Sequence, residues 1–162
     1  DGVLEVYDKV PTSRVQQLQN LANSSFKIGS KKMDIIQTGE MEAVTCALQT
    51  NASAVVMDER TLRLFIENNK NMEKLLEIRF KKNVIADKGK MDDFSKQLKS
   101  IKIIRSIELV AVAYKMGLLN DYVPDQKGGK GTLVDSILWA AKYNGSAVTT
   151  QEIEDMKEIL LK

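Results

Sequence analysis

Two pairs of acidic residues, separated by a strand-length apolar stretch, are the residues of this chain best suited to chemistry. Glu40 and Glu42 open a predicted helix, and Asp58 and Glu59 follow the apolar run Ala54–Met57. In an α/β sheet, the start of a helix and the carboxyl end of the next strand can lie at the same edge. That arrangement would bring carboxylates together where a hard divalent cation bridges them.

The composition restricts what such a site can contain. The 162 residues include no histidine, so His-based triads and His-ligated zinc are excluded within this chain. A metal site built from oxygen ligands favours magnesium, manganese or calcium. The single cysteine, Cys46, cannot form an internal disulfide, which fits a reducing cytosol. We therefore expect a cytoplasmic protein.

The bulk numbers are those of an ordinary globular chain. Hydrophobic residues make up 43% and charged residues 28% of the sequence. No apolar run approaches the roughly 20 residues that a membrane helix needs, so no membrane partner is expected. The chain starts at Asp1, in a run typical of the middle of an element, and we expect further residues upstream in the gene product.

Charge is unevenly distributed, although the net charge is only +2. Between Glu67 and Arg105, lysine and arginine clearly outnumber aspartate and glutamate. Such a local cationic surface can attract phosphate backbones. A solvated helical face with mixed ion pairs is the alternative interpretation.

Strands alternating with helices predict a mostly parallel sheet. A capping box, Thr149 with Glu152, predicts the start of the last helix, and Gly117 predicts the end of another. The small residues Ala43, Cys46, Ala47 and Thr50 predict the buried face of the helix after Gly39. The expected helices are Val15–Ala22, Glu40–Gln49, Thr61–Phe80 with an interruption at Asn68-Asn69, Met91–Leu98, Ser106–Met116, Thr132–Tyr143 and Gln151–Leu161, and the expected strands are Ser25–Ile28, Ala52–Met57 and Ile101–Ile104.

Three motifs, in order, carry a resemblance to a known family. They are Glu40-Met41-Glu42-Ala43, then Asp58-Glu59-Arg60-Thr61-Leu62-Arg63 after an apolar strand, then Ile103–Leu119. This order resembles the PIN-domain family, in particular its prokaryotic branch of RNA-cleaving proteins. The resemblance covers roughly Gly39–Leu119, with an insertion at about residues 68–100.

The resemblance implies an α/β fold, a three-layer sandwich with a mostly parallel central sheet, followed by C-terminal helices. Residues 1–122 would form the PIN-like domain, and residues 123–162 a helical extension packed on it. Family members begin with a central strand that bears an essential aspartate, which nothing in this chain supplies. We expect that strand to be absent from this chain rather than from the gene product, because a parallel sheet without its middle strand leaves backbone groups unpaired.

The resemblance also implies a function, a divalent-metal-dependent ribonuclease that cuts RNA by metal-activated water. Glu42 and Asp58 fall on the family's catalytic acids, and Glu40 and Glu59 on its additional acids. All four would bind Mg²⁺ or Mn²⁺. Arg60 and Arg63 match basic positions that would contact phosphate. RNA, a second copy in a homodimer and an antitoxin-like protein are the implied partners.

The alternative is a non-catalytic nucleic-acid-binding or scaffold domain of the same fold. The missing first acid and the basic excess motivate it. Each candidate residue also has a purely structural interpretation. The acids of the first helical turn can interact with the helix dipole, Asp58 can cap the helix that starts near Glu59, and Arg60 and Arg63 can be exposed helix charges.

Overall fold

The computed structural model describes residues 4–162, and the chain forms two compact units. Unit 1 comprises the described part of Asp1–Val55 together with Arg60–Ile103, and unit 2 comprises Val56–Glu59 together with Ile104–Lys162. Residues 1–3, the predicted start of the PIN-like domain, lie outside the described residues. The predicted boundary between residues 122 and 123 lies inside unit 2.

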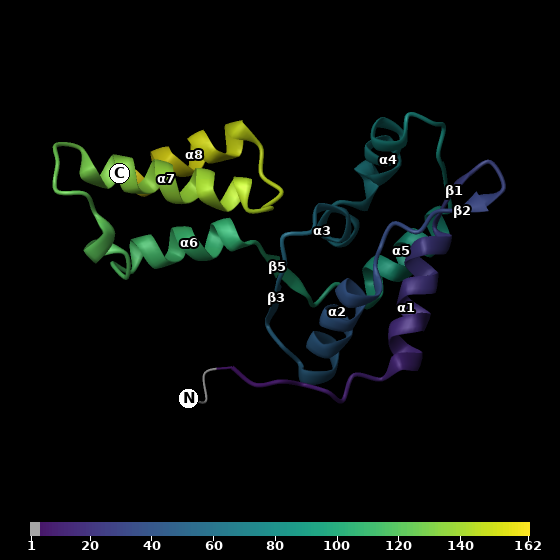
Figure 1. Cartoon of the computed structure of the whole chain (residues 1–162). Helices are drawn as coiled ribbons and strands as arrows, with labels where there is room; N and C mark the ends of the chain where they lie inside the picture. The colour runs from purple at the N-terminus through teal and green to yellow at the C-terminus, as the bar shows by residue number, and fades with distance from the viewer. Residues whose placement is uncertain (1–3) are drawn as a thin grey trace. The chain divides into compact units, whose positions relative to one another are not determined.

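Helices make up most of unit 1 (Figure 1). The first helix packs against the second and the fifth, and the third packs against the fourth and the fifth. Their bounds are α1 Thr12–Ser24, α2 Thr38–Thr50, α3 Arg60–Glu67, α4 Met72–Phe80 and α5 Lys88–Gln97, with a short 3₁₀ helix, η1, at Asn69–Asn71. The predicted interruption at Asn68-Asn69 is therefore confirmed.

A buried asparagine fixes the segment that leads into α2. Asn23, at the end of α1, accepts hydrogen bonds from the backbone N–H groups of Ile35 and Ile36, at 3.0 and 2.9 Å. Its amide donates to the carbonyl oxygen of Ile36 at 3.1 Å. A buried side chain with its polar groups paired holds a loop strongly, because breaking any bond leaves an unsatisfied group. The start of α2, with Glu40 and Glu42, is therefore well anchored.

The buried face of α2 differs from the predicted one. Met41, Val44 and Thr45 are buried together with Ala47, whereas Ala43 and Cys46 are only half-buried. Thr50, also predicted to be buried, is exposed, and its hydroxyl donates to the carbonyl oxygen of Cys46 at 2.8 Å. The larger apolar side chains gain more from leaving water than alanine does, so they take the core-facing positions.

Three short strands of unit 1 form an antiparallel sheet in the order β2-β1-β4. Three buried aromatic rings, one of them from β1, form a cluster in the core of the unit. The ring centroids of Phe26 and Phe65 lie 5.4 Å apart, and those of Phe65 and Phe94 lie 4.5 Å apart. The strand bounds are β1 Phe26–Ile28, β2 Lys31–Lys32 and β4 Ile85–Ala86.

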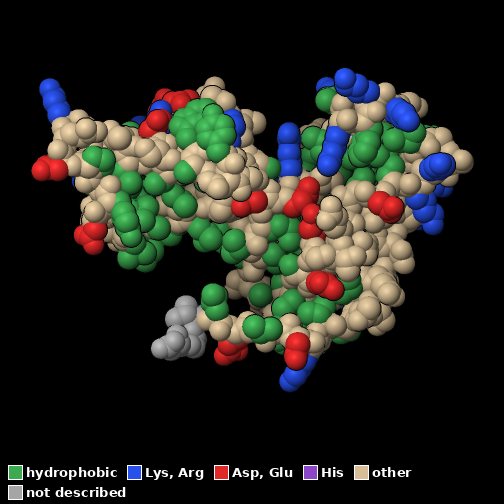
Figure 2. Space-filling model, in the orientation of Figure 1, with side chains coloured by type: hydrophobic (Ala, Val, Ile, Leu, Met, Phe, Trp, Pro, Cys, Tyr) green, Lys and Arg blue, Asp and Glu red, His purple; other side chains and the backbone are tan. Residues whose placement is uncertain are grey.

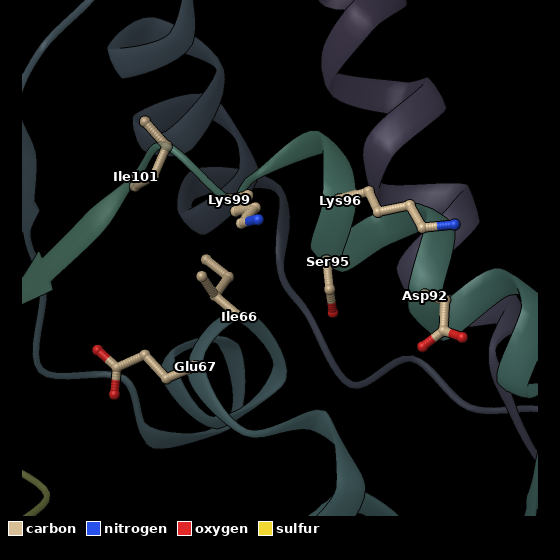
Figure 3. Close-up of a pocket in the computed structure, with 7 residues that line it drawn as sticks. All are labelled: Ile66, Glu67, Asp92, Ser95, Lys96, Lys99 and Ile101. Atoms are coloured by element: carbon tan, nitrogen blue, oxygen red, sulfur yellow. The ribbon is translucent and has the colours of Figure 1, made fainter.

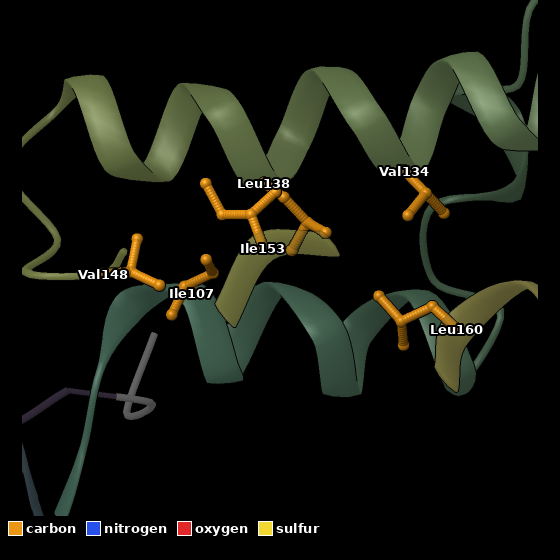
Figure 4. Close-up of a cluster of buried hydrophobic side chains, with 6 residues drawn as sticks. All are labelled: Ile107, Val134, Leu138, Val148, Ile153 and Leu160. Carbon is orange, nitrogen blue, oxygen red and sulfur yellow. The ribbon is translucent and has the colours of Figure 1, made fainter. Parts of the chain in front are cut away.

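Unit 2 consists mainly of three helices that pack on one another, α6 Ser106–Lys115, α7 Gly129–Tyr143 and α8 Thr150–Leu161. A 3₁₀ helix, η2, spans Asn120–Tyr122. The helices enclose a core of aliphatic side chains (Figure 4). Its buried members are Ile107, Val134, Leu138, Val148, Ile153 and Leu160.

Two predicted helix ends of unit 2 are confirmed. Gly117 follows α6 with φ of +75°, a conformation that glycine adopts without strain. At the start of α8, the Thr149 hydroxyl accepts from the Glu152 N–H at 3.2 Å. The Thr149 N–H donates to the Glu152 carboxylate at 2.8 Å. This is the reciprocal capping box that the sequence predicts.

The fold class, mixed α/β, is as predicted, but the finer architecture is not seen among the described strands. The strands β3 (Ala54–Val56) and β5 (Lys102–Ile104) form a two-stranded parallel sheet, and the β2-β1-β4 sheet is antiparallel. A three-layer sandwich on a mostly parallel sheet therefore stays a prediction. Among residues 4–162, no helix has the length and apolar character required to cross a membrane.

Candidate functional site

Asp58 is the candidate acid with the most defined surroundings, all of them in unit 2. It follows β3, where the Met57 N–H donates to the carbonyl oxygen of Ile104 at 2.9 Å. Its Oδ1 accepts from the N–H of Ser106, the first residue of α6, at 3.0 Å, and from the Ser146 hydroxyl at 2.8 Å. Asp58 therefore caps the start of α6, whereas the structural interpretation from sequence was a cap of the helix that starts near Glu59.

The surroundings of Asp58 favour its charged form. Partial burial alone would raise its pKa, but hydrogen bonds from Ser146 and Ser106 and the nearby Arg105 charge outweigh burial and lower the pKa. The bonds from the Ser146 hydroxyl and the Ser106 N–H both use Oδ1. Asp58 is therefore an anion at neutral pH, and its carboxylate is oriented through one of its two oxygens.

Arg105 lies close enough to Asp58 for its charge to act on that carboxylate, and the motif analysis did not single it out. Its side chain is 8% exposed, and its Nη2 and Nε donate to Glu108 Oε1 at 2.6 and 2.9 Å. Its Nη1 donates to Glu152 Oε1 at 3.0 Å and to the carbonyl oxygen of Ala147 at 3.2 Å. Arg105 thus links the first turns of α6 and α8.

These contacts shift the ionisation of both partners. Burial would lower the pKa of Arg105, but hydrogen bonds and charge from Glu108 and Glu152 raise it. Burial would raise the pKa of Glu152, but its bonds to Thr149 and Arg105 lower it. The sequence did contain a signal, since Arg105 follows a strand and Glu108 comes three residues later, the spacing of a helix cap.

Glu40 and Glu42, the other predicted acids, lie in unit 1 on the first turns of α2. Glu40 Oε2 accepts from the backbone N–H of Gln37 at 2.9 Å, a helix-capping role. Glu42 is exposed, and Glu59 is half-buried next to Asp58 in unit 2. Among residues 4–162, no three acidic or cysteine side chains are grouped as a metal ion would require.

The two predicted phosphate ligands, Arg60 and Arg63, differ in their surroundings. Arg60 is exposed at the first residue of α3. Arg63 Nη1 lies 3.8 Å from Glu67 Oε2, a loose pair one helical turn away. Its Nε is buried and has no hydrogen-bond partner among the described residues. The contacts of Arg63 are therefore those of a helix charge.

A cationic surface covers part of unit 1. Residues 60–103 contain 12 lysine and arginine residues against 6 aspartate and glutamate residues. Figure 2 shows basic side chains gathered where Figure 1 places α4 and the β1–β2 hairpin. In the sheet, Lys27 of β1 lies directly opposite Lys32 of β2. We use the term lysine face for the surface of the β1–β2 hairpin that carries Lys27 and Lys32.

An open hollow of about 330 Å³ lies elsewhere in unit 1, between α3, α5 and the segment before β5. Figure 3 shows Ile66 and Ile101 on one side of it and Ser95 on the other. The Ser95 hydroxyl donates to the carbonyl oxygen of Phe65 at 3.0 Å. Lys96 and Lys99 also line the hollow.

Comparison with protein-family models, with curated proteins and with solved structures found no match to this chain. Membership of the PIN-domain family stays a prediction from the order of the motifs.

Proposed function

We propose that this chain binds RNA through the lysine face of unit 1. The observation that carries the proposal is the cross-strand pair Lys27 and Lys32. Like charges directly opposite each other destabilise an antiparallel pair. A phosphate group between them removes that repulsion. The choice of RNA over DNA comes from the resemblance to the PIN-domain family.

The charges of the lysine face are available to a ligand. Within residues 4–162, neither of its two lysine side chains makes an ion pair or a hydrogen bond. By contrast, Lys90 lies 3.7 Å from Asp87, and Lys157 lies 2.6 Å from Asp135. Unpaired lysines bind phosphates and release condensed counterions, which makes the affinity strongly dependent on salt.

The test is a salt titration of the affinity for a labelled single-stranded RNA, followed by fluorescence anisotropy. Each phosphate contact contributes about −0.7 to the slope of log K against log salt for single strands. The double variant Lys27→Gln/Lys32→Gln should therefore reduce the magnitude of the slope by about 1.4. The matched control is Lys127→Gln/Lys130→Gln, two exposed lysines of unit 2. An affinity indifferent to salt, or an equal effect of the control, contradicts the proposal.

Metal-dependent cleavage of RNA is the second candidate function, and one feature of Asp58 favours it. Its carboxylate is charged, and hydrogen bonds from the Ser106 N–H and the Ser146 hydroxyl fix its orientation, as is common for carboxylates that bind metals. The resemblance to the PIN-domain family, and not the structure, assigns Asp58 and Glu42 as the principal ligands of Mg²⁺ or Mn²⁺ and Glu40 and Glu59 as auxiliary ligands. The three-layer sandwich, a homodimer, an antitoxin-like partner and a cytoplasmic location belong to the same hypothesis.

Cleavage of labelled RNA with manganese, with and without chelator, tests this second function. Glu42→Gln and Asp58→Asn should abolish cleavage and weaken manganese binding measured by calorimetry. Asp34→Asn, an exposed acid shortly before α2, is the matched control. Intact RNA together with unchanged metal binding by both variants rejects the nuclease. RNA binding that survives chelator would still support the lysine face.

A further inference from the structure

A pair of stacked aromatic rings, one half-buried and one exposed, lies at the end of α7 in unit 2. The rings of Trp139 and Tyr143 have centroids 5.7 Å apart and an interplanar angle of 25°. Tyr143 is 80% exposed. The Lys142 ammonium lies 5.0 Å from the centroid of the Trp139 ring. Two π systems and a cation thus meet at one end of a helix.

Neighbouring elements hold this arrangement in place. Trp139 packs against the core of unit 2, so the inner ring is anchored. The Lys142 ammonium donates to the hydroxyl of Thr150, the first residue of α8, at 3.1 Å. A ligand would therefore meet a preformed surface and would not have to order these side chains on binding.

The exposure of Tyr143 is unusual for a stacked aromatic residue. Burying a tyrosine ring is favourable, and Tyr114 of the same unit packs against the core. Tyr143 instead extends the stack away from the core. The exposed Tyr143 ring stacks on Trp139, whose own ring contacts the Lys142 ammonium. Aromatic faces joined in this way to a cation are complementary to a ligand that has both an aromatic face and a negative charge.

We propose that Trp139, Tyr143 and Lys142 form a stacking platform for an unpaired base of single-stranded RNA. The base would stack on Tyr143, and the adjoining phosphate would pair with Lys142. Double-stranded RNA is excluded, because its bases are covered by their neighbours. This inference rests on the proposed function for the identity of the ligand, but it assigns a separate contact on unit 2.

The chain provides its own reporter, because Trp139 is its single tryptophan. Short oligouridine should quench the fluorescence of Trp139 saturably, whereas an RNA duplex of the same length should not. Tyr143→Ala should weaken the affinity for oligouridine by roughly 5- to 100-fold. Tyr143→Phe, which keeps the ring, should bind like the unaltered chain. Anisotropy of labelled oligouridine measures the same affinities independently of changes in the tryptophan signal.

Tyr122→Ala is the matched control. Tyr122 is also in unit 2 and 70% exposed, but it makes no ring contact within residues 4–162. Its removal should leave the affinity for oligouridine unchanged. An equal loss in Tyr122→Ala and Tyr143→Ala, or no loss in either, overturns the platform. If the fluorescence of Trp139 per molecule falls as the protein concentration rises in the absence of RNA, the surface contacts another protein molecule. That result also overturns the platform.

The two proposals fail in different ways. Lys27→Gln/Lys32→Gln should weaken binding of long RNA in the anisotropy assay and leave quenching by a trinucleotide unchanged. Salt-dependent binding of long RNA without any change in Trp139 fluorescence rejects the platform alone. Absence of salt-dependent binding in the anisotropy assay rejects the lysine face, whatever the quenching shows.

Discussion

The Ser146 hydroxyl donates a 2.8 Å hydrogen bond to Asp58 Oδ1 across 88 positions of sequence. With the bond from the Ser106 N–H, it joins the end of β3, the start of α6 and the loop before α8. Asp58 is also one of the four acids that the family resemblance assigns to metal. Loss of activity in an Asp58 variant would therefore not identify a metal ligand until its effect on folding is known.

A double-mutant cycle measures the structural share of this contact. Ser146→Ala should destabilise the chain by about 1.5 kcal/mol, the lower end of the range for bonds to charged groups, because Asp58 is only half-buried and keeps its bond from Ser106. Asp58→Ala should cost more, and the two changes should couple by about 1 kcal/mol. Urea unfolding followed by Trp139 fluorescence reports on unit 2. Ser136→Ala, on α7, is the control outside this contact. Additive effects of Ser146→Ala and Asp58→Ala would argue against the contact.

Arg105 should matter more for stability than the exposed Arg60. Arg105→Met removes a buried cation and leaves Glu108 and Glu152 without it, at a cost of about 2–4 kcal/mol. Arg105→Lys should recover only part of that loss, because lysine cannot reproduce the planar fork that contacts two carboxylates and a carbonyl. Thermal unfolding measures the difference. Lys115→Met, at the exposed end of α6, should change the melting temperature little. If it lowers the melting temperature as much as Arg105→Met does, the role of Arg105 is rejected.

The pH dependence follows from the two lowered carboxylate pKa values. Asp58 and Glu152 bind protons less readily in the folded chain than their ordinary pKa values of 3.8 and 4.5 imply. Their stabilisation is therefore complete above those values and is lost as the pH falls below them. The urea midpoint of unit 2 should fall between about pH 6 and about pH 3. Asp58→Asn/Glu152→Gln should flatten that dependence, and an equally steep dependence would contradict this account.

Sequence patterns predicted the features that local chemistry determines. The cap of Thr149 with Glu152, the stop at Gly117 and the break at Asn68-Asn69 each depend on a few adjacent residues. Hydrophobic spacing likewise predicted α1, where Val15, Leu18 and Ala22 are buried. These features can be predicted from the sequence because their free energy depends little on the rest of the chain.

Features that depend on distant partners were not predicted. The strand β4 has two residues and exists only through pairing with β1, so no periodicity marks it. The contact of Asp58 with Ser146 and the linkage of Arg105 to Glu152 join separate elements of unit 2. Glu40 and Asp58 each accept a hydrogen bond from a backbone N–H at a helix start, and periodicity in the sequence does not show these partners.

Two glycines in the first turn of α7 provide a matched test of packing. A Cβ on Gly129 would overlap the backbone carbonyl oxygen of Pro124, which cannot rotate away, whereas a Cβ on Gly131 meets nothing within 4 Å. Gly129→Ala should therefore destabilise unit 2 by about 1–3 kcal/mol. Gly131→Ala should stabilise it by about 0.5–1 kcal/mol, because alanine loses less backbone entropy in a helix. Urea unfolding followed by Trp139 fluorescence measures both, and stabilisation by both substitutions would show that the turn at Pro124 does not pack against α7.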